Sequence, residues 1–316
     1  MKSTKGSTLH RPVMLSEVME KVFTSPHGAY VDGTIGTGGH SEAICRRISP
    51  QGLLIGLDRD EEAIRISRER LSSLGRNVHL IKESYGRLDG VLKNLGIEKV
   101  NGVLLDLGMS TYQLEGSGRG FSFSRDEPLD MRMDLDDKVT ARELVNSLSA
   151  KDLEKVLRAY GEERQAGAVS RMIDKERAKA PIDSSLRLAN LVSSVVRRPY
   201  RPGAIHPATR TFQALRIAVN REIETLGTFL EKLPPLLVKG GRLVVLTYHS
   251  LEDRMVKRTM IEWEGGCRCP PGIPECRCGS VPVMKRVHKK GMKPSDEEVG
   301  DNPRARSAIL RTAERI

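Results

Sequence analysis

Short apolar runs alternate with longer segments of helical periodicity over the first third of the chain. The runs at residues 29–31, 53–57, 78–81 and 103–105 have the length of buried strands, and residues 61–71 carry the spacing of an amphipathic helix. Alternating strands and helices are typical of a parallel sheet that binds its ligand at the carboxyl ends of the strands. The pattern therefore predicts an α/β fold with a Rossmann-like sheet.

This alternation stops after Asp106. A glycine-rich and aromatic stretch follows at residues 112–123, and after it come helical patterns with no strand pattern among them. We interpret residues 112–205 as a helical domain inserted into the sheet domain. Residues 1–111 then form the first part of the sheet domain, and residues 206–316 form its second part.

The last third of the chain returns to the sheet domain. Residues 207–233 are expected to form one long helix, because a proline opens it and an apolar stripe runs along it. The sheet is expected to resume at residues 243–246, after a turn at residues 240–241. Residues 281–287 and 308–312 are expected to supply a final antiparallel pair of strands.

The sequence Asp32-Gly-Thr-Ile-Gly-Thr-Gly-Gly-His40 directly follows the first apolar run. Glycine permits the positive φ angles of a tight strand-to-helix turn, and it lets backbone N–H groups come close to a nucleotide-like cofactor. Side chains in place of the glycines, Gly33, Gly36, Gly38 and Gly39, would block that approach. Their spacing fits neither the dinucleotide pattern nor the phosphate-loop pattern. The loop therefore predicts a cradle for another cofactor.

Polar residues also follow the other three apolar runs. Asp58 ends the second run about twenty residues after the glycine loop, where a carboxylate commonly accepts both hydroxyls of an adenosine ribose. Ser84 and Tyr85 follow the third run, and Asp106 ends the fourth. An acid that merely caps a helix would explain any one of these positions. Their recurrence favours a ligand-binding edge.

Length and composition agree with an intracellular enzyme, and the charge is unevenly distributed. The chain has 316 residues, 38% of them hydrophobic, with no apolar run near the length of a membrane span and no signal-peptide centre. We expect a cytoplasmic protein with no membrane partner. The formal net charge is +11, and residues 184–221 contain seven arginines without an Asp or Glu. This one-signed block favours a phosphate backbone as partner over a solvated surface.

Four of the five cysteines lie close together as Cys267, Cys269, Cys276 and Cys278. Four thiolates on two turns would suit a structural metal ion, although paired cysteines of zinc sites usually have two residues between them. A reduced surface loop is the alternative. No metal is expected to take part in the chemistry.

Seven motifs resemble those of the RsmH family, also called MraW. They run in order from the first predicted strand almost to the last residue: Asp32-Gly-Thr-Ile-Gly-Thr-Gly-Gly-His-Ser41, Asp106-Leu-Gly-Met-Ser110, Arg119-Gly-Phe-Ser-Phe123, Pro128-Leu-Asp-Met-Arg-Met-Asp134, His206-Pro-Ala-Thr-Arg-Thr-Phe-Gln213, His249-Ser-Leu-Glu-Asp-Arg254 and Asn302-Pro-Arg-Ala-Arg-Ser307. The resemblance implies a class I S-adenosyl-L-methionine-dependent methyltransferase sheet with an inserted α-helical domain. It also implies the reaction, which is methylation of the exocyclic N(4) amine of one cytidine in the decoding region of 16S ribosomal RNA, in the small ribosomal subunit. The sequence is also compatible with a homodimer.

The resemblance also implies site residues. Cofactor contacts are expected at Gly38, Gly39, His40, Asp58, Tyr85, Asp106 and Gln113. The chain departs from the family pattern at a few places, with Met109, Thr111 and Tyr112 where Val, Ser and Pro are usual, Ile35 where Phe is common, and Thr247-Tyr248 where Ser-Phe is common. These departures concern loop rigidity and aromatic stacking rather than the reaction.

Asp106 and Ser110 are the candidate catalytic residues. The cytosine amine is a poor nucleophile because its lone pair is delocalised into the ring, so acceptors for the amine protons would help to localise that pair. Asp106 and Ser110 stand where enzymes that methylate amino groups of nucleic acids place such acceptors, although Asp106 would equally suit cofactor positioning alone.

The target base must be single-stranded or flipped out. The candidate stacking residues are Tyr112, Phe121 and Phe123, with core packing as the alternative for both phenylalanines. His249 would either line the acceptor pocket or cap a helix.

Two other functional classes fit part of the sequence. A nicotinamide-dependent oxidoreductase would share the sheet and Asp58, but it would leave the glycine spacing and the arginine block unexplained. A non-catalytic RNA-binding ribosome assembly factor would explain the arginine block but not the glycine loop together with Asp58 and Tyr85. Thermal stabilisation by S-adenosylmethionine, by a nicotinamide or by neither separates the three classes.

Overall fold

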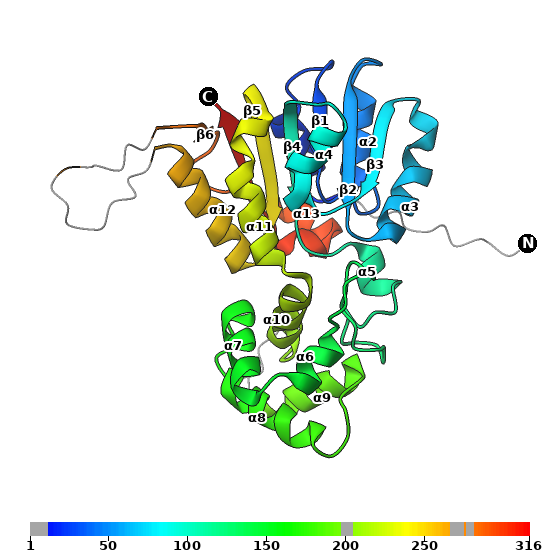
Figure 1. Cartoon of the computed structure of the whole chain (residues 1–316), viewed down its shortest axis with the longest axis vertical. Helices are drawn as coiled ribbons and strands as arrows, with labels where there is room; N and C mark the ends of the chain where they lie inside the picture. Colours follow the sequence, from blue (N-terminus) through cyan, green and yellow to red (C-terminus); the bar gives the residue numbers. More distant parts are fainter. Residues whose placement is uncertain (1–11, 197–204, 266–274, 276–280) are drawn as a thin grey trace, which may run out of the picture. The chain divides into compact units, whose positions relative to one another are not determined.

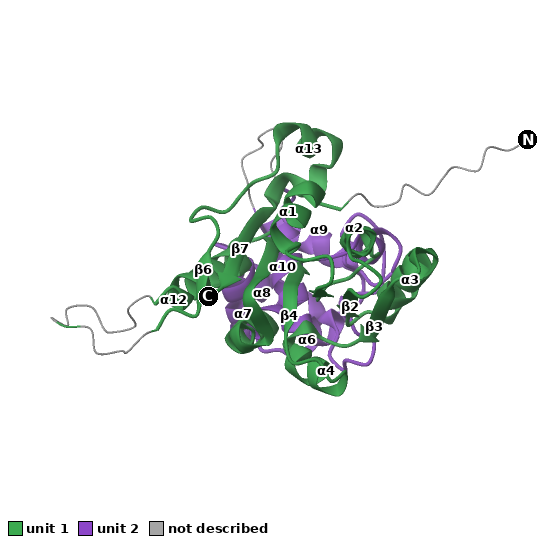
Figure 2. Ribbon diagram, turned by 90° about the horizontal axis from the view of Figure 1, so that it is seen from above, with its two compact units in different colours: residues 1–108, 225–316 green, residues 109–224 purple. Residues whose placement is uncertain are grey.

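The computed structural model describes the chain apart from residues 1–11, 197–204, 266–274 and 276–280. The chain forms two compact units (Figure 2). The first combines residues 1–108 and 225–316, and the second consists of residues 109–224. The second unit is inserted in the first, and it extends further along the chain than the predicted end at residue 205.

The first unit contains a seven-stranded sheet with the strand order β3-β2-β1-β4-β5-β7-β6 within the described residues (Figure 1). Strands β1 to β5 pair in parallel, whereas β7 is antiparallel to both of its neighbours. The predicted α/β fold class with a Rossmann-like sheet is confirmed. The strands are β1 (Ala29–Asp32), β2 (Leu53–Asp58), β3 (Asn77–Lys82), β4 (Val100–Asp106), β5 (Leu237–Thr247), β6 (Met284–Arg286) and β7 (Ile309–Arg315).

Helices cover both faces of this sheet, so neighbouring strand residues enter two different apolar layers. On β2, for example, Ile55 packs in one layer and Leu54 in the other, and Leu105 and Leu104 divide in the same way on β4. This explains the continuous apolar runs, since strands buried on both faces show no polar alternation. The helices are α1 (Leu15–Val22), α2 (Gly39–Arg47), α3 (Glu61–Leu71), α4 (Leu88–Asn94), α11 (Glu222–Lys232), α12 (Ser250–Trp263) and α13 (Asp296–Asp301).

Strand β5 is longer than the sequence predicts. It begins at Leu237, and the expected turn at Gly240-Gly241 lies inside it as an irregularity of the sheet. Gly240 has a φ of 77°, and the pairing with β4 shifts register between Val100 and Gly102. A local glycine signal cannot distinguish a turn from a bulge, because the neighbouring strand decides which one forms. The expected final antiparallel pair is confirmed as β6 and β7.

The second unit is helical throughout the part that the structure describes. The predicted apolar stripes lie in its core, including Leu153 and Leu157 on α7, Val169 on α8, and Leu188 and Val192 on α9. Its helices are α5 (Thr111–Glu115), α6 (Ala141–Ser147), α7 (Ala150–Gly161), α8 (Ala166–Arg177), α9 (Ser185–Val195) and α10 (Thr209–Asn220). In the described residues of both units, no helix combines the length and the apolar character that a membrane span needs.

The single helix expected at residues 207–233 is wrong. The chain forms α10 and α11 instead, with Arg221 between them at a φ of 50°. The cause is tertiary: Asn220 is fully buried, its side chain accepts a bond of 2.8 Å from Met133 N and donates one of 2.8 Å to Met131 O. The apolar stripe continues through the break, so periodicity alone could not reveal it.

Replacing Asn220 with Ala should therefore destabilise the helical unit. The change leaves the N–H of Met133 and the carbonyl of Met131 buried without this partner, which costs about 2–4 kcal/mol of unfolding free energy. Scanning calorimetry of the purified chain measures the effect. The control is Asn190→Ala, at an exposed position of α9, which should change the free energy by less than about 0.5 kcal/mol. Equal effects of the two changes would contradict this account of the break.

Candidate functional site

Three aspartates end strands of the first unit at the same edge of the sheet. Asp32 ends β1, Asp58 ends β2 and Asp106 ends β4. Since these strands are parallel, their carboxyl ends lie together, as expected of a ligand-binding edge. The glycine loop joins β1 to α2 at this edge.

Backbone hydrogen bonds fix the glycine loop to the neighbouring strands. The N–H of Gly33 donates to Leu104 O over 2.9 Å, and that of Ile35 donates to Leu57 O over 2.9 Å. Gly38, with a φ of 79°, is the N-cap residue of α2 and supplies no side-chain cap. The first-turn N–H groups of α2 are therefore not used by a side-chain cap, and a cofactor can accept bonds from them.

Two of the loop glycines are required by the protein itself. A Cβ atom at Gly33 would lie 2.5 Å from Leu105 Cδ2, and one at Gly39 would lie 2.6 Å from Pro12 Cγ. Neither distance is tolerable for packed carbon atoms. The sequence interpretation attributed all four glycines to the approach of the cofactor. At Gly33 and Gly39, close packing of the loop on its own protein is already a sufficient reason.

Asp58 is a desolvated acceptor next to this loop. Its Oδ2 accepts a bond of 3.0 Å from Gly36 N, and its Oδ1 accepts one of 2.9 Å from Asp60 N. Burial raises the pKa of Asp58 to about 6, although both N–H bonds oppose the shift. A carboxylate offers about four acceptor positions, so two remain for ligand hydroxyls.

Asp106 is held by groups from three other segments. Its N–H donates to Thr34 Oγ1 over 2.6 Å, Tyr248 Oη donates to its Oδ1 over 2.6 Å, and Nδ1 of His40 lies 3.6 Å from its Oδ2. Burial and the Asp106 carboxylate raise the pKa of Tyr248 well above its usual value. The phenol therefore remains a donor to Asp106 over the working pH range. Sequence reasoning noted Tyr248 as a departure from the family pattern but gave it no role.

His40 and Asp32 complete a polar cluster behind the loop. Nε2 of His40 lies 3.0 Å from Val13 O, and because a carbonyl only accepts, this nitrogen must carry a proton. Asp32 is 2% exposed and accepts a bond of 2.7 Å from Ser41 Oγ. Burial raises the pKa of Asp32, and the nearby His40 opposes the shift. Both ring nitrogens of His40 face protein groups, which suits a residue that orients Asp106.

Tyr85 lies beside the same loop. It begins a short 3-10 helix (Tyr85–Arg87) after β3, and its ring packs edge-on against Phe229 at a centroid distance of 5.5 Å. A Cβ atom at Gly33 would be 3.0 Å from Tyr85 Cβ. The first unit thus brings together Gly38, Gly39, His40, Asp58, Tyr85 and Asp106 of the predicted site residues.

Ser110 and Gln113 belong to the helical unit, where they cap α5. The hydroxyl of Ser110 accepts a bond of 3.2 Å from Gln113 N, and the Gln113 side chain accepts one of 3.1 Å from Ser110 N. This reciprocal pair is a capping box, and it buries Gln113 to 5% exposure. Both residues therefore have a local structural role in addition to any contact with ligands.

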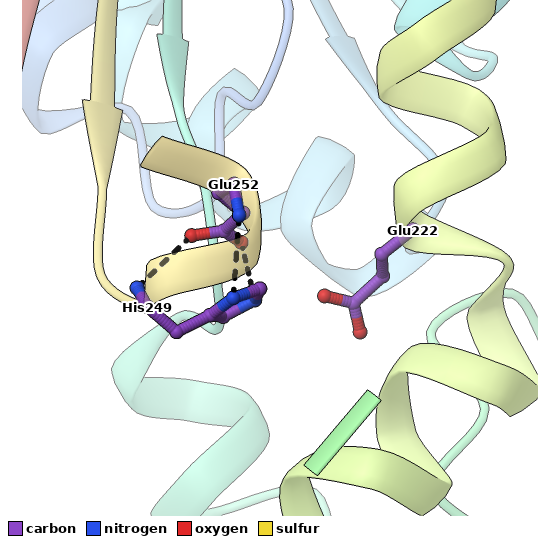
Figure 3. A group of neighbouring side chains, drawn as sticks. All are labelled: Glu222, His249 and Glu252. Carbon is purple, nitrogen blue, oxygen red and sulfur yellow. Dashed lines mark hydrogen bonds and ion pairs between the residues drawn. The ribbon is translucent and has the colours of Figure 1, made fainter. Parts of the chain in front are cut away.

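His249 caps helix α12 (Figure 3). Its Nδ1 accepts from Glu252 N at 3.5 Å, while Glu252 Oε2 accepts from Tyr248 N at 2.9 Å. Its Nε2 lies 3.0 Å from Glu252 Oε1 in a geometry that makes no hydrogen bond. Of the two interpretations of His249, the structure shows the helix cap. Glu222, also labelled, belongs to the helical unit and pairs there with Arg216.

The arginine block is less available to phosphates than the sequence suggests. Arg216 is 8% exposed and donates two bonds of 2.8 Å to Glu222, so its charge is neutralised within the unit. Arg210 donates to Glu162 O over 3.0 Å and Arg187 donates to Ala180 O over 3.2 Å. Arg221, at the break between α10 and α11, is exposed. The other three arginines of the block, Arg197, Arg198 and Arg201, and the cysteines Cys267, Cys269, Cys276 and Cys278, lie outside the described residues.

The aromatic candidates differ in burial. Phe121 is 5% exposed in the core of the helical unit, which is the packing alternative expected for it. Phe123 is half-buried, stacks on His206 at 4.6 Å and meets Phe212 edge-on at 5.3 Å. Tyr112 is also half-buried. Tyr112 and Phe123 therefore stay the candidates for a stacking surface.

A family model and curated relatives identify the family to which this chain is similar. The family model described as the MraW methylase family matches residues 7–316. A curated relative from Geotalea uraniireducens, named ribosomal RNA small subunit methyltransferase H, is 46% identical over 307 residues, which cover 97% of this chain and 98% of the relative. Its namesake from Geobacter sulfurreducens is 45% identical over 307 residues, with coverages of 97% and 99%. A solved rRNA methylase from Streptococcus thermophilus aligns over 98% of this chain and 99% of its own length, with 13% identity and a TM-score of 0.43.

Tyr248→Phe should lower the stability of the first unit while leaving its fold intact. The change removes a hydrogen bond to a carboxylate, which is worth about 1.5–3 kcal/mol when one partner is buried. Calorimetric unfolding measures the loss. Tyr112→Phe is the control, because the described structure shows no hydrogen bond to that hydroxyl, and it should change the free energy by less than about 0.5 kcal/mol. A loss no larger than that of the control would show that Tyr248 does not hold Asp106.

Proposed function

The chain belongs to the MraW methylase family, and on that premise we propose that it is an S-adenosylmethionine-dependent ribosomal RNA methyltransferase of the cytoplasm. Its proposed target is the exocyclic N(4) amine of a cytidine in the decoding region of 16S ribosomal RNA, position 1402 in the family's numbering. The curated relatives named ribosomal RNA small subunit methyltransferase H support the class of substrate. The observation that carries the chemistry is the oriented carboxylate of Asp106 at the ligand-binding edge.

The cofactor assignment is supported by the residues around the glycine loop. Asp58 has acceptor positions for the two ribose hydroxyls, and the first turn of α2 offers backbone donors without a side-chain cap. Gly38 has the positive φ of 79° that starts this turn, and Tyr85 lies beside Gly33 of the same loop. We assign Gln113, from the helical unit, as a further cofactor contact on the strength of the family resemblance.

The bound cofactor supplies an electrophilic methyl group on a sulfonium. Transfer is an in-line displacement, in which the amine nitrogen forms a bond to the methyl carbon while the carbon–sulfur bond breaks and its electrons stay on sulfur. The protein therefore contributes mainly orientation. The methylated amine is positively charged and loses its proton after the transfer, so no strong base is needed beforehand.

Asp106 is assigned to the amine. Its Oδ1 is held by Tyr248 and its Oδ2 faces His40, so the carboxylate is oriented yet keeps acceptor positions for an amine proton. A hydrogen bond from the amine N–H to this carboxylate helps to localise the nitrogen lone pair, while the proton stays on nitrogen until after the transfer. We assign Ser110, four residues further along the chain, to the same amine, with its hydroxyl oxygen as the acceptor.

The proposed role of Asp58 predicts the pH dependence of cofactor binding. Its pKa is raised to about 6, so the carboxylate becomes protonated as the pH falls through about 6 and then accepts fewer hydrogen bonds from the ribose. Affinity for S-adenosylmethionine should decrease over this range and be constant above it. Titration calorimetry at a series of pH values measures this. Asp58→Asn should bind weakly at every pH, whereas Asp89→Asn, an acid on α4 paired with Lys232, should follow the wild type.

The chemistry predicts different effects for the two catalytic candidates. Asp106→Ala should reduce turnover by at least about 100-fold, as removal of one oriented polar group does in other active sites. Ser110→Ala should reduce turnover but retain cofactor affinity. Because Ser110 also caps α5, the control is Ser149→Ala, which removes the N-cap of α7 and should retain activity. Labelled methyl transfer to small-subunit RNA provides the measurement.

The product nucleoside decides the proposed reaction. After digestion of the RNA, mass spectrometry should find N(4)-methylcytidine. A methyl group on carbon 5 would contradict the mechanism, since that reaction bonds the methyl to a ring carbon instead of the amine and normally uses a cysteine nucleophile, a role that the proposal gives to no residue. RNA binding without any methyl transfer would instead favour the alternative function, a non-catalytic RNA-binding ribosome assembly factor.

A further inference from the structure

A second one-signed segment lies in the first unit. Residues 276–295 contain no Asp or Glu, while residues 285–293 alone contain five lysines and arginines and one histidine. The arginine block is in the helical unit, so this segment is separate from it in the chain. Solvated surfaces normally mix both signs of charge, so a segment with cations alone is more typical of a surface that binds an anionic partner.

Nearby acids neutralise only the beginning of the segment. Lys285 pairs with Glu314 at 3.0 Å, and Arg286 pairs with Glu264 at 2.6 Å. The cations that follow are all exposed, and none makes an ion pair with a described residue: His288, Lys289, Lys290 and Lys293. We call residues 288–293 the cationic bulge.

Backbone hydrogen bonds to β7 hold the cationic bulge at two places, one just before it at Val287 and one within it at Met292. Val287 N donates to Thr312 O over 3.0 Å, and Met292 exchanges two bonds of 2.9 and 2.8 Å with Leu310. Between these two contacts the chain advances five residues, from Val287 to Met292, while β7 advances only two, from Leu310 to Thr312. The extra residues must therefore protrude from the side of the sheet. Gly291 fixes the return, because a Cβ atom there would lie 2.4 Å from Ile309 Cγ2.

The register of the sheet places the cationic bulge at the same edge as Asp106. Met292 pairs with Leu310, Leu310 pairs with Leu246 on β5, and Leu246 pairs with Asp106 on β4. These four residues form one row across the sheet. With about 4.8 Å between neighbouring strands, the row spans roughly 15 Å, a distance that a few nucleotides of single-stranded RNA can bridge.

We propose that the cationic bulge binds phosphates of the RNA on one side of the methylated base. This inference rests on the proposed function, since it takes Asp106 as the place of that base. Lysine ammonium groups act as point charges that hold a backbone without reading its sequence. Contact with phosphates releases condensed counterions from the RNA, and this release makes binding to a cluster of unpaired cations more favourable.

The first experiment compares two triple variants. Lys289→Ala, Lys290→Ala and Lys293→Ala remove three charges from the cationic bulge. The matched control, Lys93→Ala, Lys99→Ala and Lys239→Ala, removes three exposed lysines near the opposite ends of the strands, where β4 and β5 begin. The probe is a fluorescent single-stranded RNA with the decoding-region sequence, and its affinity is measured by anisotropy over a series of salt concentrations.

The bulge variant should reduce the slope of log affinity against log salt by about two units, because each phosphate that is no longer neutralised lowers the slope by about 0.7 unit. The control should leave the slope near that of the wild type. Affinity for S-adenosylmethionine should be unchanged in both. Equal slopes in the two variants would overturn the proposal. Aggregation of the bulge variant at an unchanged slope would also overturn it, and would assign these lysines to protection of the sheet edge.

A second experiment locates the contact on the RNA. Single phosphates at increasing distance from the target cytidine are replaced by neutral methylphosphonates. Within a few nucleotides on one side of the target, neutralisation should weaken wild-type binding but not binding of the bulge variant, since both changes remove the same interaction. Additive losses at every phosphate would overturn the proposal. Methyl transfer by the wild-type protein, measured in parallel, tests the proposed function separately, because the salt slopes are readable whether or not transfer occurs.

Discussion

The hydrogen bonds that hold carboxylates at the carboxyl edge of the sheet are the interactions on which the site depends. Asp58 accepts from Gly36 N and so fixes the glycine loop to β2, and Asp106 accepts from Tyr248 Oη. Burial raises the pKa of Asp58 to about 6. Fixed donors from backbone and side chains keep such acids in place without neutralising them, so they can still accept bonds from a ligand.

The parallel sheet and its loop could be predicted because their signals are local. Strands buried on both faces appear as apolar runs, as Leu54 and Ile55 illustrate on β2. Each run ends in a polar residue, as is usual at the carboxyl edge of a parallel sheet that binds a ligand. The predicted helix at residues 61–71 has the bounds found in the structure, since Asp60 caps it.

The features that sequence reasoning missed depend on partners far away in the chain. The break between α10 and α11 lies at Asn220, whose side chain bonds to the segment around Met131. The sequence pattern near residue 220 does not indicate this break. Arg216 looked like a phosphate contact because its partner, Glu222, lies one residue beyond the arginine block. Composition over a window cannot detect pairing across its boundary, so a one-signed block indicates a binding surface only after its ion pairs have been assigned.

The same test favours the cationic bulge. The two cations before it, Lys285 and Arg286, have acidic partners, and those pairs fix the strand that leads into it. The lysines of the bulge itself make no ion pair with a described residue. One row of the sheet then joins the bulge to Asp106 through β7 and β5. The strands of the sheet fix the distance between the bulge and Asp106, and all of them belong to the first unit. The proposed phosphate contact and the proposed place of the base would therefore keep a fixed separation within the first unit alone.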